Sequence, residues 1–233
     1  MARVLIVEDD NVIATSMARH LVAAGFDVGV VNDGRTAMSR LRFEHVDVCV
    51  LDLMLPEVDG WKVIETCRSE GMGTPFVVVS ARGSEHDRVQ TLEIGADDYI
   101  SKPFSMRELV TRVRVAARRR GSPPVPDRGE TITLGELRIE PRRVQAYVND
   151  MDAELTPTEF RLLHALAIEP GRVFTRDELL QNIWNRRQTH RDRTVDVFVR
   201  RLRDKIDRRS ERFTYVQTRY GVGYLLEAVE RPA

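Results

Sequence analysis

Short apolar runs alternate with amphipathic segments through the first half of the chain. Valine-rich runs of this length are typical of buried strands, and they occur at residues 3–7, 28–31, 46–51, 76–79 and 99–100. Segments with helical spacing follow them, at residues 12–21, 34–43, 61–69, 86–94 and 106–119. Strands that alternate with helices in this way predict an α/β fold with a five-stranded, parallel, doubly wound sheet.

The alternation ends near residue 120. Residues 120–130 contain three prolines and two glycines without apolar periodicity, which is typical of a linker. Short strand patterns follow and predict an antiparallel sheet, at residues 132–134, 137–140, 143–148 and 153–155. We therefore expect a first domain at residues 1–120, a linker at 121–130 and an α+β domain at 131–230.

Three helices are predicted in the second domain, and the third is the most informative. The first two begin at capping boxes, Thr156-Pro-Thr-Glu159 and Thr175-Arg-Asp-Glu178. The third covers residues 193–206, and at 100° per residue its core residues lie within an arc of about 60°: Val195, Val199, Leu202 and Ile206. The opposite face of this helix carries Arg193, Val197, Arg200 and Arg201. Thr194 lies towards the edge of that face.

Phe198 lies between these two faces, and packing in the core is about as well supported as contact with a thymine methyl group. Residues 213–226 then alternate like a β-hairpin, with Arg219 and Tyr220 at its tip. Between residues 186 and 219 there are 12 basic and 5 acidic side chains, although the formal net charge of the chain is zero. A helix with an apolar back and an arginine front predicts binding in a groove lined with phosphates.

The overall composition is ordinary for a globular protein, with 42% hydrophobic and 31% charged residues. No apolar run approaches the roughly 18 residues of a membrane span, and the amino terminus lacks the apolar stretch of a signal peptide. We therefore expect a cytoplasmic protein without a membrane partner.

Polar residues follow the strands of the first domain. Because the carboxyl ends of parallel strands meet at one edge, these side chains should converge: Glu8, Asp9, Asp52, Ser80 and Lys102. Each alone has an ordinary interpretation, as a helix cap, a turn hydroxyl or a solvated cation. Three clustered carboxylates, however, repel one another unless a cation lies between them, and they suit Mg²⁺. With the metal bound, Asp52 can attack a phosphoryl group whose charge spreads over Mg²⁺, Lys102 and Ser80.

Four motifs at this edge resemble the receiver domain of bacterial two-component systems, over residues 1–120. They are Val-Glu8-Asp9-Asp10, Leu-Asp52-Leu-Met-Leu-Pro56, Val-Val-Ser80-Ala-Arg82 and Gly95-Ala-Asp-Asp-Tyr99-Ile-Ser-Lys102-Pro103-Phe104. The resemblance implies that Asp52 accepts phosphate from a histidine kinase. It implies that Mg²⁺ is held by Glu8, Asp9, Asp52 and the backbone carbonyl of Met54. It also implies that Ser80 and Tyr99 form a switch pair and that the Lys102-Pro103 bond is cis.

Two other classes of protein fit these residues less well. A flavin- or dinucleotide-binding fold needs a glycine-rich loop after the first strand, where Glu8, Asp9 and Asp10 stand. A haloacid-dehalogenase-type phosphatase resembles a receiver in its aspartate nucleophile, but it needs a second aspartate where Met54 stands. We therefore expect the phosphoryl group to be lost slowly, as in a regulator and not in an enzyme.

Residues 85–119 carry charges of both signs, including Glu93. Solvated helix faces are the ordinary interpretation, because single exposed ion pairs contribute little to stability. The positions also resemble those that pair across a two-fold receiver dimer in the OmpR/PhoB-type subfamily. That resemblance implies an apolar patch with Leu92 and Val110, and these pairs between chains: Arg88 with Glu108, Asp98 with Arg112, and Asp97 with Arg119.

The second domain resembles the winged-helix effector domain of the same subfamily, over residues 130–228. The motifs are Leu155-Thr-Pro-Thr-Glu-Phe160, Arg193-Thr-Val-Asp-Val197 and Thr218-Arg-Tyr-Gly-Val-Gly-Tyr224. The resemblance implies that one set of residues faces the major groove of double-stranded DNA: Arg193, Thr194, Val197 and Arg201. It also implies that the hairpin at residues 213–226 is the wing, from which Arg219 contacts the DNA. Arg200 and Tyr220 are further candidates, and Phe198 stands where a polar residue is common.

Together these patterns predict a phosphorylation-dependent transcriptional regulator. Phosphorylation of Asp52 is expected to favour a homodimer that binds DNA, with RNA polymerase as a further partner. The alternative is a constitutive DNA-binding regulator whose receiver is a phosphate-independent scaffold for dimerisation or partner binding. Loss of an acidic residue or of Lys102 would have favoured that alternative, and all of them are present.

Overall fold

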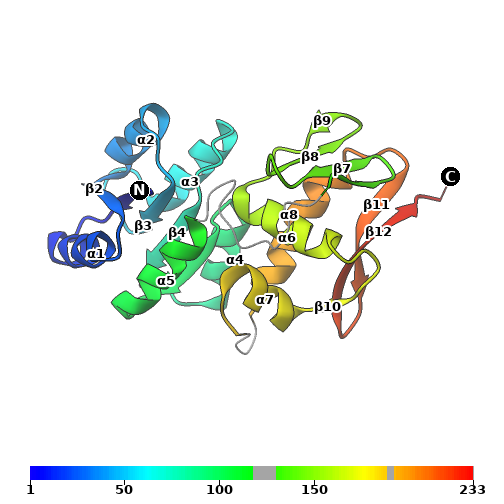
Figure 1. Ribbon diagram of the computed structural model, residues 1–233. Helices are drawn as coiled ribbons and strands as arrows, with labels where there is room; N and C mark the ends of the chain where they lie inside the picture. Colours follow the sequence, from blue (N-terminus) through cyan, green and yellow to red (C-terminus); the bar gives the residue numbers. More distant parts are fainter. Residues whose placement is uncertain (118–129, 188–191, 233) are drawn as a thin grey trace. The chain divides into compact units, whose positions relative to one another are not determined.

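The computed structural model describes residues 1–117, 130–187 and 192–232, and the chain forms two compact units, Met1–Arg119 and Arg120–Ala233 (Figure 1). The first unit contains a sheet of five parallel strands in the order β2-β1-β3-β4-β5. The strands are β1 (Arg3–Val7), β2 (Asp27–Val31), β3 (Val48–Leu51), β4 (Phe76–Ser80) and β5 (Asp98–Ser101). The helices are α1 (Asn11–Ala23), α2 (Gly34–Phe43), α3 (Gly60–Ser69), α4 (Glu85–Glu93) and α5 (Met106–Ala116).

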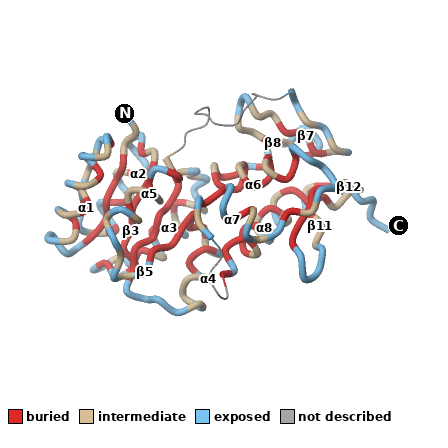
Figure 2. Tube along the Cα trace, turned by 60° about the horizontal axis from the view of Figure 1, so that its bottom comes forward, coloured by how far each residue is buried: buried red, intermediate tan, exposed pale blue. Residues whose placement is uncertain are grey.

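Helices cover both faces of this sheet. α1 and α5 lie side by side on one face, and α2 and α3 on the other (Figure 1). The inner strands β3 and β4 are buried along their whole length (Figure 2). Because both faces are covered, these strands are continuously apolar and do not alternate with polar residues. The predicted α/β fold is confirmed.

Backbone hydrogen bonds hold the ends of the strands together at one edge. The Asp52 N–H donates to the Val7 carbonyl at 2.9 Å, and Glu8 directly follows Val7. The Lys102 N–H donates to the Ser80 carbonyl at 2.8 Å. The polar residues after β1, β3, β4 and β5 therefore meet where the sequence predicted.

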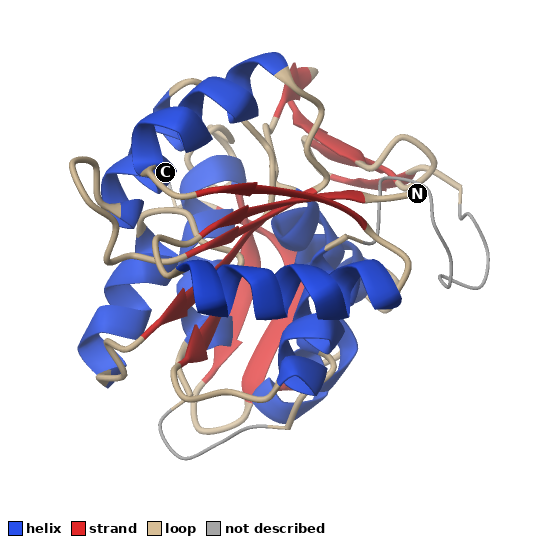
Figure 3. Cartoon of the chain, turned by 90° about the vertical axis from the view of Figure 1, so that its left-hand side faces the viewer, coloured by secondary structure: helices blue, strands red, loops and turns tan. Residues whose placement is uncertain are grey.

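The second unit has two antiparallel sheets, with strand orders β6-β7-β8-β9 and β10-β12-β11. Along the chain its helices follow the first sheet and precede the last two strands, with β10 between the first two helices. Figure 3 shows the helices of the chain in blue and its strands in red. The strands are β6 (Ile132–Leu134), β7 (Leu137–Glu140), β8 (Gln145–Val148), β9 (Met151–Asp152), β10 (Phe174–Thr175), β11 (Phe213–Arg219) and β12 (Gly223–Glu230). The helices are α6 (Pro157–Ala167), α7 (Arg176–Trp184) and α8 (Thr194–Ile206).

Both predicted capping boxes are confirmed. Thr156 and Glu159 exchange side-chain and backbone hydrogen bonds at the start of α6, and Thr175 and Glu178 do so at the start of α7. The α8 helix is different, because its first flanking residue, Arg193, makes no side-chain capping bond.

Two predicted strand positions are wrong. The strand expected from residue 143 begins at Gln145, because Val144 has a φ of 55°, in the left-handed region. The strand expected at residues 153–155 lies at Met151–Asp152, and Glu154 has a φ of 52°. Neither left-handed residue is glycine, so the apolar pattern gave no sign of these turns.

Candidate functional site

Asp52 lies at the carboxyl end of β3 with both side-chain oxygens engaged. Its Oδ2 accepts a hydrogen bond from Lys102 Nζ at 2.6 Å, and its Oδ1 accepts one from the Met54 N–H at 2.9 Å. Lys102 Nζ also donates to Glu8 Oε2 at 2.8 Å. The predicted convergence of Glu8, Asp52 and Lys102 is therefore present, and the Lys102-Pro103 bond is cis, as expected.

The charges in this cluster are only partly balanced. Burial raises the pKa of Glu8, and the neighbouring Asp52 raises it further, against the lowering effect of Lys102. Burial by itself would lower the pKa of Lys102, but its hydrogen bonds to Asp52 and Glu8 raise that pKa overall. The ammonium therefore stays charged, and burial disfavours the ionised form of Glu8. Three carboxylates beside one cation leave the cluster with an excess of negative charge.

The acidic residues fit a divalent cation. Glu8, Asp9 and Asp52 each offer a carboxylate oxygen, and these oxygens lie within 4.8 Å of one another. Hard oxygen donors that leave room for water suit Mg²⁺, and the excess negative charge favours its binding. Met54, whose carbonyl was predicted as a further ligand, stands beside the cluster because its N–H is bonded to Asp52. Asp10 has another role, since it caps α1 through the N–H groups of Val12 and Ile13.

The two predicted switch residues meet at Arg82, in the loop between β4 and α4. Ser80 Oγ accepts a hydrogen bond from the Arg82 N–H at 3.3 Å, and the Tyr99 hydroxyl donates to the Arg82 carbonyl. Both Ser80 and Tyr99 are buried, and burial raises the pKa of Tyr99, which keeps its proton on the hydroxyl. Ser80 thus bonds the N–H of Arg82, and Tyr99 bonds the carbonyl of the same residue.

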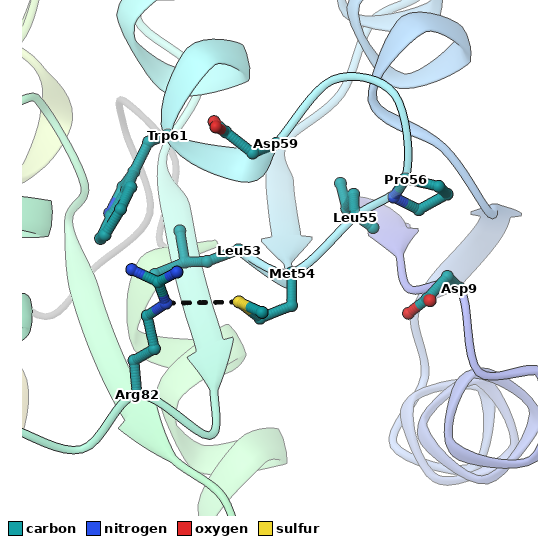
Figure 4. A pocket seen from close by; sticks show the side chains of 8 residues that line it. All are labelled: Asp9, Leu53, Met54, Leu55, Pro56, Asp59, Trp61 and Arg82. Carbon is teal, nitrogen blue, oxygen red and sulfur yellow. Dashed lines mark hydrogen bonds between the residues drawn. The ribbon is translucent and has the colours of Figure 1, made fainter.

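The Arg82 side chain, which the sequence did not single out, lies at the mouth of the site. Its guanidinium stacks 4.6 Å from the centre of the Trp61 ring, and its Nε lies 3.3 Å from Met54 Sδ (Figure 4). Trp61 in turn donates to Thr91 of α4 at 2.8 Å. A cavity of about 400 Å³ opens here, lined by Asp9, Leu53, Met54, Leu55, Pro56, Asp59, Trp61 and Arg82.

Several charges predicted to pair between two chains are paired within one. Arg112 lies 3.2 Å from Asp98 and 3.2 Å from Glu108. Asp97 lies 2.9 Å from Arg68 of α3. Arg119 is outside the described residues. The other predicted interface residues lie on α4, which carries Arg88, Leu92 and Glu93, and on α5, which carries Val110. The pairs between chains stay a prediction.

The predicted core face of α8 is confirmed, because Val195, Val199, Leu202 and Ile206 are all buried. Phe198 is fully buried as well, and its ring packs edge-on against Trp184 with the centroids 4.9 Å apart. Of the two interpretations of Phe198, packing in the core is the one observed. Its predicted place among the DNA contacts is wrong in this structure, since the Trp184 ring occupies the space beside it.

Arg201 and Thr194 are also engaged inside the second unit. Arg201 Nη2 lies 2.6 Å from Glu159 Oε1, and the guanidinium lies 4.6 Å from the centre of the Phe198 ring. Thr194 Oγ1 accepts a hydrogen bond from Arg186 at 2.6 Å. These contacts correct the expectation that both side chains simply face a groove. Val197 is buried, whereas the remaining predicted contacts are exposed: Arg193, Arg200, Arg219 and Tyr220.

Glu159 is a buried charge that the sequence indicated only as a helix cap. Its Oε2 accepts hydrogen bonds from Lys205 Nζ at 2.7 Å and from the Thr156 N–H at 2.8 Å. Burial alone would raise the pKa of Glu159, but Arg201 and Lys205 lower it to about 2. This carboxylate therefore ties α8 to the start of α6.

A second polar network ties α8 to the terminal hairpin. Arg176 Nε donates to Asp196 of α8 at 2.9 Å, and the Tyr224 hydroxyl of β12 donates to the same carboxylate. Arg203 donates from Nε and Nη2 to the Val216 carbonyl of β11, at 3.0 and 2.9 Å. The α8 helix is thus fixed on one flank to the hairpin and on the other to α6.

Within the part of the chain that the structure describes, every helix is too short or too polar to cross a membrane.

Comparison with known proteins assigns both units. Residues 4–114 match the family model described as "Response regulator receiver domain". Residues 150–226 match the model described as "Transcriptional regulatory protein, C terminal". The chain is 38% identical over 231 residues to the alkaline phosphatase synthesis transcriptional regulatory protein PhoP of Bacillus subtilis, covering 97% of this chain and 96% of that protein.

Solved structures agree with this assignment. DrrB of Thermotoga maritima, described as an OmpR/PhoB homolog, is 27% identical with a TM-score of 0.51, covering 97% of this chain and 99% of its own. A mutant of RitR has the same fold, with 24% identity, a TM-score of 0.73 and the same coverage. The chain therefore belongs to the OmpR/PhoB-type response regulators of two-component systems, with a receiver domain and a winged-helix DNA-binding domain.

Proposed function

We propose that the protein is a phosphorylation-dependent transcriptional regulator, in which a receiver at residues 1–120 is joined by a linker at 121–130 to a winged-helix domain at 131–230. Asp52 accepts a phosphoryl group from a histidine kinase. The observation that carries this proposal is the environment of Asp52, whose two oxygens are oriented by Lys102 Nζ and the Met54 N–H beside further carboxylates.

The chemistry is a transfer onto oxygen. An Asp52 oxygen attacks phosphorus, the phosphorus–nitrogen bond of the kinase phosphohistidine breaks, and an acyl phosphate forms. Glu8, Asp9, Asp52 and the Met54 carbonyl would hold Mg²⁺, which would supply positive charge to the phosphoryl oxygens. Lys102 already donates to Asp52 and is placed to follow the new negative charge. Because Met54 offers no acid in place of the second aspartate of a phosphatase, hydrolysis is slow.

Arg82 couples phosphorylation of Asp52 to the rest of the receiver, because it is bonded to both Ser80 and Tyr99. Ser80 Oγ accepts from the Arg82 N–H and can donate its own proton to a phosphoryl oxygen. When Ser80 turns towards the phosphoryl group, the loop that carries Arg82 shifts together with the hydroxyl of Tyr99. A phosphoryl group can act only by binding one receiver state better than the other, so the change is a population shift. The favoured state forms a two-fold dimer through α4, β5 and α5.

The dimer places two winged-helix domains on adjacent DNA half-sites. Three exposed arginines supply most of the affinity through phosphate contacts: Arg193, Arg200 and Arg219. Tyr220 adds a contact at the tip of the wing. RNA polymerase is the further partner expected of a regulator that acts on transcription.

The test of phosphorylation uses acetyl phosphate and Mg²⁺, with intact-protein mass spectrometry as the readout. We expect one phosphoryl group on the wild type and none on Asp52→Asn or after chelation of Mg²⁺. Asp59→Asn is the matched control, because Asp59 lines the same cavity but caps α3, a role that asparagine can keep. Equal incorporation by Asp52→Asn and the wild type would contradict the proposal and favour a receiver that works as a phosphate-independent scaffold.

A further inference from the structure

Arg201 and Lys205 share the buried carboxylate of Glu159, but they are attached to it differently. Lys205 Nζ donates to Glu159 Oε2 at 2.7 Å and to the Glu154 carbonyl at 2.7 Å. Arg201 Nη2 lies 2.6 Å from Oε1, yet that oxygen has no donor in hydrogen-bonding geometry among the described residues. Lys205 is therefore anchored by two directional bonds, whereas Arg201 is attached to Glu159 by charge alone.

We propose that Arg201 changes partner when DNA binds, from Glu159 to a backbone phosphate, while Lys205 stays on Glu159. The inference rests on the proposed DNA-binding function. It goes beyond that function by assigning Glu159 and Lys205 as positioning residues. In the free protein Glu159 binds Arg201, and Lys205 allows Arg201 to leave for a phosphate when DNA binds.

The position of Arg201 on α8 suits both partners. It lies one helical turn after Val197, on the face predicted for DNA, and one turn before Lys205, which contacts Glu159 at the start of α6. The guanidinium lies on the Phe198 ring, 4.6 Å from its centre, and that ring is held by Trp184. The long arginine side chain can therefore turn away from Glu159 without a change in the path of α8.

The charge balance explains why two cations are present. A buried carboxylate that loses its one cation is left uncompensated, and this is strongly destabilising. In this cluster Glu159 keeps Lys205 and the Thr156 N–H after Arg201 leaves, so the departure leaves no unpaired buried charge. Arg201 in turn gains a phosphate, with which a guanidinium can form two parallel hydrogen bonds.

The experiment measures the affinity of the full-length protein for a mixed-sequence DNA duplex over a range of salt concentrations. The slope of log K against log salt falls by about 0.9 for each phosphate that the protein no longer neutralises. We expect Arg201→Met to reduce the slope by about 0.9. Lys205→Met should reduce it equally, because Arg201 then has to stay on Glu159.

Two variants serve as controls. Lys205→Arg keeps a cation on Glu159 and should keep the wild-type slope. Glu159→Gln combined with Lys205→Met removes the carboxylate that retains Arg201, so the wild-type slope should return. That pair also leaves no buried charge unpaired, which makes it usable if Lys205→Met alone fails to fold. Adding Arg201→Met to the pair should again reduce the slope by about 0.9.

Two results would overturn the exchange. One is a wild-type slope in Arg201→Met or in Lys205→Met, and the other is a slope that stays reduced in Glu159→Gln combined with Lys205→Met. Either result leaves the proposed function intact as long as the wild type binds the duplex. If the wild type binds no DNA at any salt concentration, the proposed function fails and the exchange fails with it.

Discussion

Each unit of this protein buries carboxylate and cation side chains together, but with opposite excess charge. The receiver cluster sets Lys102 against three carboxylates, those of Glu8, Asp9 and Asp52. The cluster in the second unit sets one carboxylate, that of Glu159, against Arg201 and Lys205. An excess of carboxylates favours a further cation, whereas two cations on one carboxylate allow one of them to move to a phosphate. The sign of the excess therefore matches the ligand proposed for each unit.

The largest expected effect comes from removing the ring that supports Arg201. Phe198→Ala deletes the packing against Trp184 and leaves a cavity in a buried site, so it should lower the free energy of unfolding of the second unit by about 3–5 kcal/mol. Chemical denaturation with separate probes for the two units measures this. Tyr220→Ala, at a side chain that is 93% exposed, is the control and should stay within about 0.5 kcal/mol. A similarly small effect of Phe198→Ala would mean that the ring is not part of the core.

Acid should affect the two clusters in opposite directions. The pKa of Glu159 is lowered from 4.5 to about 2, so its stabilisation is complete above pH 4.5 and is lost as the pH falls towards 2. The loss amounts to about 3 kcal/mol. The pKa of Glu8 is raised, mainly by burial, so its contribution is present below pH 4.5 and is lost as the pH rises.

Unfolding curves at several pH values test this contrast. Glu159→Gln should remove the acid-dependent loss in the second unit, and Glu8→Gln should make the receiver more stable relative to the wild type as the pH rises. Shifts of the same sign for the two variants would contradict the charge balance described for the two clusters.

The smallest expected effect concerns the affinity of the receiver for Mg²⁺. Lys102→Met removes a positive charge that donates to Asp52 and Glu8, so the cluster should bind Mg²⁺ roughly tenfold more tightly. Isothermal titration calorimetry measures the affinity directly. Lys62→Met is the control, because Lys62 pairs with Glu65 on an exposed face of α3 and should leave the affinity unchanged. Weaker binding by Lys102→Met would show that the lysine supports the metal site and does not compete with it.

The same comparison shows what the sequence could predict. In the receiver, Asp52 and Lys102 directly follow strands, so a correct strand assignment was enough to place them at one edge. In the second unit, the capping box correctly predicted the local bonds of Glu159. Its burial against α8 depends on residues more than 40 positions later in the chain, and no local pattern contains that information.

Side-chain partners were predicted less well than positions. The helical projection put Arg201 near the face for DNA, but it could not show that Glu159 competes for the guanidinium. Asp97 was expected to meet Arg119 of a second chain, and within one chain it lies beside Arg68 of α3, a partner that the sequence did not indicate. Both partners come from other helices, so they are set by packing and not by spacing within one element.

The most direct test of the account combines DNA binding with hydrodynamic mass, for the wild type and Asp52→Asn, with Mg²⁺ and with or without acetyl phosphate. We predict that only the wild type becomes dimeric and binds DNA more tightly, and only with the phosphodonor. If both proteins are already dimeric and bind DNA equally with and without the donor, Asp52 is not the switch, and the receiver is a phosphate-independent scaffold.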